Sequence, residues 1–339
     1  MKFIKLPRNG VKHESIKRVT KLLFPIVLLL ILTCFPVPSQ AEKTSINIIC
    51  TNSVLADFTS NLLTENVSID YIMPSGVCPA QYDTTPSDLD KIVTADIIIS
   101  IGSPKMDGWL EALLAYNPDA DLIESTYMGE WNIPLGAKKY VEKIRDGLAL
   151  LLPDHNVTIQ TNAEEYIIRI DETAEQLLEM VQNNRSQGKK IICIQWYKDF
   201  LEWLGLNVTY YYDSPEFLSL QDEIDIMNAA SDKDVCAVID NLQSGTEFGA
   251  HVASESGVSH IIFTNFPEAL PGTDTYLEMI TYNTRQLING ISTYEYKQGR
   301  IKELESTLSG MELQRNASLI LIFILGLLVV ILFLLYKKK

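Results

Sequence analysis

The chain has 339 residues and a formal net charge of −15. The first 41 residues and the last three are basic, so the residues between them carry a net charge of −24. This surplus of carboxylates excludes nucleic acids and anionic membrane surfaces as partners of that segment. The length is enough for two domains of ordinary size.

The N-terminal 41 residues predict a secretory signal peptide. Seven Lys and Arg side chains precede an apolar run over residues 22–35, and a small-x-small motif ends at Ala41. This order of basic, apolar and small residues is typical of a signal that is removed on export. The mature chain is therefore expected to begin at Glu42 and to lie outside the cytoplasm.

Predicted strands and helices alternate over residues 42–135. Apolar runs predict strands at residues 45–50, 67–73, 96–101 and 121–123, and the stretches between them predict helices at 53–63, 87–95 and 106–114. We expect Ser53 to cap the first helix and Ser87 or Asp88 to cap the second. Since parallel strands need a crossover helix, the pattern indicates a parallel sheet in a first α/β lobe.

A helical segment and a second alternating segment follow. Residues 136–188 predict a helix over 136–152 and a long helix over 158–186. Residues 189–291 predict a second α/β lobe, with strands at 189–194, 207–212, 235–239 and 260–263 and helices at 196–204, 220–230, 246–256 and 275–289.

The C-terminal residues predict a stalk and a membrane anchor. In residues 292–316, the apolar side chains of Ile301, Leu304, Leu308 and Met311 recur at spacings of three and four. They predict a stalk helix, which either stands alone or pairs with another chain as a short coiled coil.

Residues 317–336 carry no charge and are followed by three lysines, residues 337–339. At 1.5 Å per residue this run spans about 30 Å, the thickness of a bilayer core. The lysines place the tail in the cytoplasm. We therefore expect a single-pass protein of the cell membrane with an extracytoplasmic binding domain.

Polar and aromatic side chains gather where predicted strands end, which is where ligands bind in open α/β sheets. The candidate ligand-binding residues are Asn52, Cys78, Gln81, Tyr82, Asp83, Gln195, Trp196, Tyr197, Asp240, Asn241, Gln243, Ser244 and Asn265. Amides, hydroxyls and aromatic rings suit a polar organic ligand, whereas Asp83 and Asp240 are the carboxylates best placed for a cation. Asn52 has a second interpretation, as a plain helix cap.

The cysteines and histidines form no familiar metal or redox motif. Cys50, Cys78, Cys193 and Cys236 lack CxxC spacing. Cys193 and Cys236 are interpreted as buried thiols. For Cys50 and Cys78 three alternatives stay open: a disulfide, soft metal ligands, or simple packing.

Three histidines, His155, His251 and His260, follow the signal peptide and have no metal-pair spacing. They are interpreted as structural or solvated. Nucleophile elbows, phosphate loops, HExxH motifs and paired catalytic carboxylates are absent from the sequence, so we predict that the protein is not an enzyme.

The loop between the second and third predicted strands carries a family signature. Its residues are Gly76, Pro79, Tyr82, Asp83, Pro86, Ser87, Asp88, Leu89, Ala95, Asp96 and Gly102. With residues 50–57 and 271–283, this pattern resembles substrate-binding proteins of zinc and manganese ABC transporters over residues 46–291. The resemblance implies an α/β fold: two Rossmann-like lobes with parallel sheets joined by one long helix. The C-terminal transmembrane helix is an addition.

The chain departs from that family at the metal ligands. The position of the family's loop histidine is Ala80, and a second histidine has no counterpart in residues 131–137. A third falls near Gln195 and Trp196, and the carboxylate ligand falls near Asn265. The fold is thus expected without the usual histidine site.

We therefore expect the extracytoplasmic solute-binding component of an ABC importer. The resemblance implies a metal ion or metal-containing solute as ligand, so a divalent metal ion is a possible cargo, with a permease and an ATPase as partners. Two alternatives remain: a receptor for a small polar organic solute, and an adhesin-like surface module that has lost transport.

Overall fold

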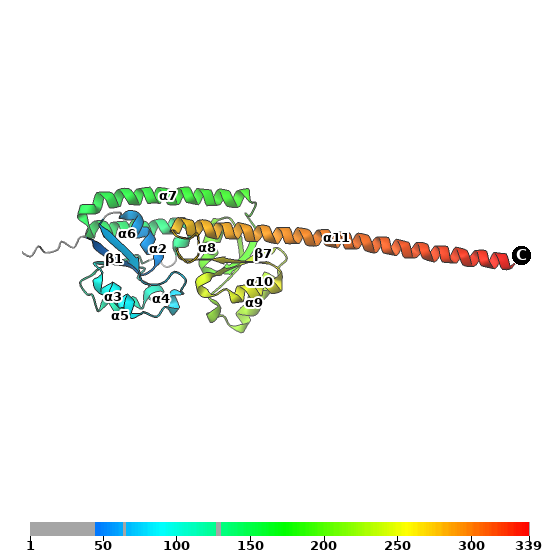
Figure 1. Ribbon diagram of the computed structural model, residues 1–339, viewed down its shortest axis with the longest axis horizontal. Helices are drawn as coiled ribbons and strands as arrows, with labels where there is room; N and C mark the ends of the chain where they lie inside the picture. The colour runs from blue at the N-terminus through cyan, green and yellow to red at the C-terminus, as the bar shows by residue number, and fades with distance from the viewer. Residues whose placement is uncertain (1–44, 64–65, 127–129, 339) are drawn as a thin grey trace, which may run out of the picture. The chain divides into compact units, whose positions relative to one another are not determined.

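The computed structural model describes residues 45–63, 66–126 and 130–338. The signal peptide predicted for residues 1–41 lies outside the described residues. Residues 46–338 contain two four-stranded sheets in which every strand pair is parallel, with helices around them (Figure 1). The predicted α/β class is confirmed.

Lobe one is built on the sheet order β2-β1-β3-β4. Its strands are β1 (Ile46–Cys50), β2 (Val67–Tyr71), β3 (Ile97–Ser100) and β4 (Asp121–Glu124), and its helices are α2 (Ser53–Leu62), α3 (Pro86–Thr94), α4 (Pro104–Asp107) and α5 (Leu110–Leu114). The 3₁₀ turns η1 (Pro79–Gln81) and η2 (Glu130–Asn132) belong to the same lobe. All four residues of β3 are buried, as expected for a strand covered by helices on both faces.

Lobe two repeats this arrangement with the order β6-β5-β7-β8. Its strands are β5 (Lys190–Ile194), β6 (Asn207–Tyr212), β7 (Val235–Asn241) and β8 (Ser259–Phe263), and its helices are α8 (Lys198–Trp203), α9 (Leu220–Ala230) and α10 (Glu247–Ser256). The 3₁₀ turns η4 (Gln195–Tyr197), η5 (Pro215–Phe217) and η6 (Leu242–Ser244) each follow a strand. In both sheets the strand order reverses after the first strand, which creates a crevice beyond the carboxyl ends of the strands.

Two helices lie between the lobes in the chain: α6 (Pro134–Leu151), and after η3 (Pro153–His155) the 28-residue α7 (Asn156–Asn183). The ring of Phe58 on α2 lies 6.2 Å from the rings of both Tyr140 on α6 and Tyr166 on α7, and 5.1 Å from the ring of Tyr276. This buried aromatic cluster packs the connecting helices against lobe one. The long joining helix that the resemblance implied is confirmed.

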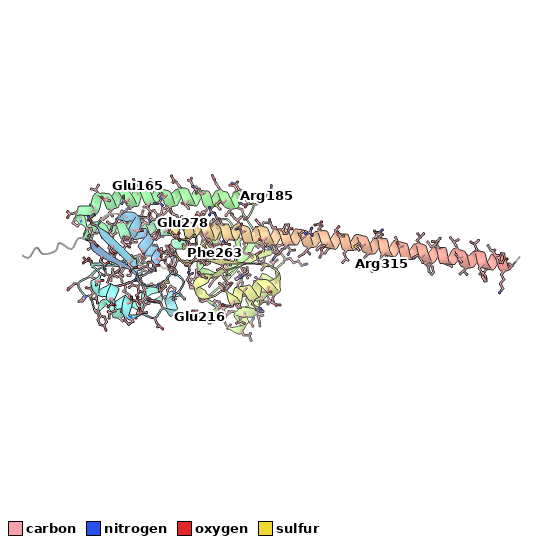
Figure 2. The ribbon with its side chains drawn as sticks, viewed as in Figure 1. Glu165, Arg185, Glu216, Phe263, Glu278 and Arg315 are labelled. Atoms are coloured by element: carbon pink, nitrogen blue, oxygen red, sulfur yellow. The ribbon has the colours of Figure 1, made fainter. Side chains whose placement is uncertain are left out.

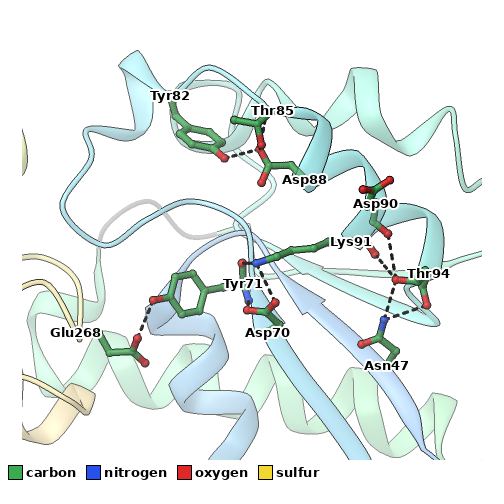
Figure 3. Close-up of polar contacts among 10 residues, drawn as sticks. All are labelled: Asn47, Asp70, Tyr71, Tyr82, Thr85, Asp88, Asp90, Lys91, Thr94 and Glu268. Carbon is green, nitrogen blue, oxygen red and sulfur yellow. Dashed lines mark hydrogen bonds and ion pairs between the residues drawn. The ribbon is translucent and has the colours of Figure 1, made fainter.

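The caps predicted at Ser53 and at Ser87 or Asp88 are wrong by one to three residues, whereas the second interpretation of Asn52, as a plain helix cap, is confirmed. Asn52, rather than Ser53, caps α2, since its Oδ1 accepts a hydrogen bond of 3.1 Å from the backbone of Leu55. Thr85, rather than Ser87 or Asp88, precedes α3. The Asp88 carboxylate accepts from the backbone N–H and the hydroxyl of Thr85, at 2.6 and 2.9 Å (Figure 3). Asp88 therefore acts as the third residue of a capping box.

The predicted closing helix, stalk and anchor form one continuous helix, α11 (Tyr276–Lys337), of 62 residues. The sequence has no proline after Pro271, so nothing breaks the backbone hydrogen bonds along this stretch. Buried residues of α11 end at Ile291. Its C-terminal part is long and apolar enough to cross a membrane, and none of that window is buried.

Candidate ligand-binding cleft

A cleft of about 590 Å³ opens between the two lobes. Lobe one lines it with Cys78, Pro79, Ala80, Pro104, Lys105, Met106, Trp131 and Asn132. Lobe two lines it with Gln195, Trp196, Asp213, Ser214, Glu216, Phe217, Asn241, Gln243, Ser244, Asn265 and Phe266. Each segment follows the carboxyl end of a strand, where open α/β sheets bind their ligands.

The structure brings seven of the predicted site residues together in this cleft. They are Cys78, Gln195, Trp196, Asn241, Gln243, Ser244 and Asn265. Six belong to lobe two, where they follow β5, β7 and β8, three neighbouring strands of the sheet. Their common location follows from the sheet order, because the carboxyl ends of parallel strands meet at one edge. Ligand contact by these seven residues stays a prediction.

Four predicted residues of lobe one lie outside the cleft lining. Asn52 is occupied as the cap of α2. The Tyr82 hydroxyl donates to Asp88 at 2.7 Å (Figure 3), and burial and this carboxylate raise the pKa of Tyr82. Asp83 is exposed in the loop that follows.

Gln81 also points out of the lining but still spans the two lobes. Its side-chain amide donates to the carboxylate of Glu216, which is labelled in Figure 2. Since Glu216 lines the cleft, this contact lies at the edge of the cleft and joins η1 to η5.

Two predicted residues of lobe two are fully buried rather than cleft-facing. Asp240 accepts a hydrogen bond of 2.8 Å from the hydroxyl of Tyr212, and its second oxygen lies 2.8 Å from Nε2 of His260. The Tyr197 hydroxyl accepts from the side chain of Asn241 at 2.7 Å. Asp240 thus links β6, β7 and β8 inside the lobe, and His260 has the structural position interpreted from the sequence.

Neutral amides connect the lobes across the floor of the cleft. The indole N–H of Trp131 donates to the backbone carbonyl of Asn265 at 2.9 Å. The Asn132 side chain donates to Oδ1 of Asn265 at 3.0 Å and to the carbonyl of Trp196 at 3.3 Å. The Gln243 side chain donates to the carbonyl of Ser75 at 2.7 Å. We call Asn132, Gln243 and Asn265 the amide clamp.

Two hydroxyls strengthen the connection beside the clamp. Ser53 donates to the carbonyl of Pro267 at 3.0 Å, and Tyr71 donates to the carboxylate of Glu268 at 2.7 Å (Figure 3). Each such hydrogen bond contributes about 1 kcal/mol. Several together favour the arrangement in which the lobes are in contact.

Aromatic rings and carboxylates of lobe two face the cleft. The side chain of Trp196 is 41% exposed and that of Phe217 is 67% exposed, so both rings present faces to a ligand. Asp213 accepts from the side chain of Gln195 and from the backbone of Ser214, each at 2.8 Å. These contacts orient the carboxylate of Asp213 at the cleft. The arrangement can stack a planar group and hydrogen-bond polar atoms.

The segment after β6 also lines the cleft and was not among the residues predicted from the sequence. Asp213, Glu216 and Phe217 line the cleft, yet only the ends of β5, β7 and β8 supplied candidates in lobe two. The signal was present, since the predicted strand over residues 207–212 is followed by the turn Asp213-Ser214-Pro215. Ligands of open α/β sheets bind at the carboxyl ends of the strands, so the residues after β6 could have been predicted in the same way as those after β5, β7 and β8.

The metal-ligand positions implied by the resemblance do converge on the cleft, but without metal ligands. Ala80, Gln195, Trp196 and Asn265 line it, and so do Trp131 and Asn132 of the segment 131–137. Alkyl, indole and neutral amide groups lack the imidazole, thiolate and carboxylate donors that divalent transition metals select. Among the described residues, no group of three or more His, Cys, Asp or Glu side chains can hold a metal ion. The cleft does not fit a bare ion held by the usual donor set.

The structure excludes one of the three alternatives for Cys50 and Cys78, and the choice between metal ligand and packing stays open for Cys78. Both thiols are free, so the disulfide alternative is wrong. Cys50 is buried, and desolvation raises its pKa to about 12, which makes packing its role. Cys78 lines the cleft. Cys193 and Cys236 are buried, as interpreted from the sequence.

Comparison with known proteins places the two lobes in one family. The family model described as zinc-uptake complex component A, periplasmic (ZnuA), matches residues 48–290, which is more than half of the chain. The manganese-binding lipoprotein MntA of Halalkalibacterium halodurans is 25% identical over 275 residues, covering 75% of this chain and 91% of the relative. The manganese ABC transporter substrate-binding lipoprotein PsaA of Streptococcus pneumoniae is 32% identical over 81 residues, covering 24% of this chain and 26% of the relative.

Solved structures show the same fold. A periplasmic metal binding protein from Candidatus Liberibacter asiaticus gives a TM-score of 0.64 at 17% identity, covering 73% of this chain and 100% of that chain. A crystal structure of ZnuA gives 0.63 at 18% identity, covering 73% and 99%. Because the family model spans both lobes and the cleft between them, the chain belongs to the family of zinc-uptake complex component A, among relatives that are substrate-binding lipoproteins of metal ABC transporters.

Proposed function

We propose that the protein is the extracytoplasmic solute-binding component of an ABC importer, held to the membrane by the C-terminal part of α11. Its cargo is a metal-containing solute that brings its own ligand shell into the cleft, and it delivers this cargo to a permease driven by an ATPase. Family membership supports the transport role, since the relatives include the manganese-binding lipoprotein MntA and the manganese ABC transporter substrate-binding lipoprotein PsaA. Binding and delivery need no catalytic group in the chain.

One observation carries the choice of cargo: the cleft residues at or near the positions expected for metal ligands, among them Ala80, Gln195 and Asn265, carry no imidazole or carboxylate. For a bare cation, the interaction with neutral amides adds little binding free energy beyond the hydration free energy that the ion loses when it leaves water. A metal complex with an organic shell offers donors, acceptors and apolar surface, which match amides and aromatic rings. The volume of about 590 Å³ lies within the range of small-molecule sites.

A second candidate is a polar organic solute without metal. The exposed rings of Trp196 and Phe217 favour it, because stacking requires a planar group and no ion. The two candidates share the cleft and differ only in whether metal accompanies the solute.

The test begins with the full chain purified in detergent without chelator. Native mass spectrometry gives the mass of any bound solute, and elemental analysis of the same sample gives the metal content. We expect one organic mass and one metal ion per chain. An organic mass without metal would select the second candidate, and one metal ion without organic mass would overturn both.

Variants then locate the bound solute. Trp196→Ala and Asp213→Asn should lower the amount of co-purified solute, since both residues line the cleft. Tyr116→Ala is the matched control, because Tyr116 is 63% exposed on lobe one and does not line the cleft. If neither solute nor metal is found and no tested solute shifts the melting temperature, the chain acts as the surface module considered above.

A further inference from the structure

The stalk part of α11 presents an apolar stripe that no other described residue covers. Ile301, Leu304, Leu308 and Met311 are 47%, 60%, 61% and 62% exposed. Figure 2 labels Arg315 on the same exposed stretch of the helix. The stripe repeats at three and four residues, the spacing of one helix face.

This stripe has the register of a coiled coil. With Ile301 at heptad position a, Leu304 is at d, Leu308 at a and Met311 at d. In the first heptad, a β-branched residue at a (Ile301) with leucine at d (Leu304) is the combination that favours two parallel strands. The apolar register ends at Arg315, the next a position, beside the uncharged run of residues 317–336.

The charges that flank the stripe suit a second copy of the same chain. In this register Arg300 occupies position g and Glu305 occupies the following e position. Residues g and e of neighbouring heptads face each other between two parallel helices. Arg300 of each chain therefore meets Glu305 of the other, giving two attractive pairs. Within one chain, Arg300 pairs with Glu303 at 2.6 Å on the exposed helix surface.

A single stalk helix contains two glycines that destabilise it, and no tertiary packing among the described residues offsets this cost. Most of the stability of a helix in a protein comes from packing of its apolar face, which this solvated segment lacks. Gly299 and Gly310 each cost about 1 kcal/mol relative to alanine in a helix interior. A Cβ at either glycine would meet no atom of the described residues within 4 Å, so no close approach among these residues requires a glycine at either position. Burial of the stripe against a partner helix supplies the missing stabilisation.

We propose that residues 297–314 are the docking surface for a second copy of this chain and form a parallel two-stranded coiled coil. The proposal rests on the proposed membrane anchor, because two chains anchored in one bilayer have parallel stalks. Two heptads are short for association in dilute solution. Anchoring raises the local concentration, so that pairing resembles an intramolecular event.

The test uses the full chain in membranes and single-cysteine substitutions on the stalk. Leu304→Cys and Leu308→Cys introduce thiols at d and a, and Ser306→Cys and Leu313→Cys introduce them at position f on the opposite face. After mild oxidation, the disulfide-linked dimer should be about tenfold more abundant at a and d than at f, because a disulfide requires Cβ atoms about 4 Å apart. The unsubstituted chain gives the background of its native thiols.

Charge reversal tests the partner without relying on the apolar positions. In the Leu308→Cys chain, Arg300→Glu should lower the dimer yield several-fold, and adding Glu305→Arg should restore it. Glu303→Gln is the control, since it removes only the contact within one chain.

Other outcomes overturn the proposal. Equal yields at a and f would indicate random collision, and no dimer at any position would indicate a monomeric stalk. A cross-linked product whose mass is not twice that of the chain would assign the stripe to another protein. Extraction of the membranes with alkaline carbonate distinguishes failure of the proposed anchor from failure of the proposed pairing. A chain that is released from the membrane lacks the anchor, whereas a monomer that is retained refutes only the pairing.

Discussion

Replacing Asp57 with asparagine should raise the stability of the protein at neutral pH. Asp57 lies on α2 where this helix meets α7 and α11, and it accepts a hydrogen bond of 2.8 Å from the hydroxyl of Tyr166. The backbone of Tyr276 donates to the same carboxylate. Desolvation nevertheless raises the pKa of Asp57 from 3.8 to about 6. Asparagine keeps an accepting oxygen for both donors and cannot ionise.

The raised pKa of Asp57 gives both the sign and the size of its contribution to the free energy of unfolding. The folded state binds the proton of Asp57 more tightly than the unfolded state does, so the contribution to stability is complete below pH 3.8. It is lost as the pH rises to about 6 and stays lost above that value. About two pH units at about 1.4 kcal/mol each give a loss of about 3 kcal/mol. We expect Asp57→Asn to recover about 1–3 kcal/mol of this at pH 7, since part of the hydrogen bonding to the charged form is given up.

The assay is urea unfolding followed by tryptophan fluorescence at pH 4, 5, 6 and 7. A chain that ends at residue 316 suffices, because the buried part of α11 ends at Ile291. Wild type and variant should agree at pH 4 and diverge by pH 7. Asp154→Asn, at an exposed carboxylate, is the control and should follow the wild type. If the free energy of unfolding of Asp57→Asn keeps the full pH dependence of the wild type, ionisation of Asp57 does not destabilise the folded state.

Two further predictions concern packing and thiol access. Gly249→Ala should lower the free energy of unfolding by about 2–4 kcal/mol, because a Cβ there would lie 1.9 Å from the carboxylate of Asp240. Gly299→Ala, with no atom within 4 Å, should be neutral or stabilising by up to about 1 kcal/mol; a urea midpoint that is the same for the two variants would contradict this contrast. Among residues 45–338, maleimide should label one thiol of the native chain, Cys78, because the other three cysteines of this segment are buried. Mass spectrometry that finds a second label in this segment before unfolding would show that the lobes open further than the contacts imply.

Local signals in the sequence were enough to predict the fold. The bounds predicted for β6 and α9, residues 207–212 and 220–230, are those of the structure. Gly205 adopts the positive φ of 87° that ends the preceding helix, and Ser219 caps α9. Where several capping residues stand together, as at Asn52 and Ser53, the sequence alone does not decide which side chain accepts the bond.

The cleft was predictable only in part, because strand-end position does not fix side-chain direction. Successive side chains of a strand point to opposite faces of the sheet. At the end of β7, Asn241 therefore faces the cleft, whereas its neighbour Asp240 points into the lobe. A change of one residue in register would exchange them. The long-range partners of Asp240, Tyr212 and His260, come from other strands and leave no local signal.

The amide clamp gives a reason why the cargo should carry its own polar shell. Asn132 donates to Asn265 across the lobes, so opening the cleft frees both a donor and an acceptor. Under the proposed function, a solute with oxygen and nitrogen atoms can satisfy both groups, and the exchange costs little free energy. A bare cation satisfies the freed carbonyl oxygen of Asn265 but leaves the N–H groups of Asn132 unpaired in a partly desolvated cleft, which costs about 1–3 kcal/mol. The groups that hold the lobes together therefore also disfavour a bare ion relative to a metal-containing solute.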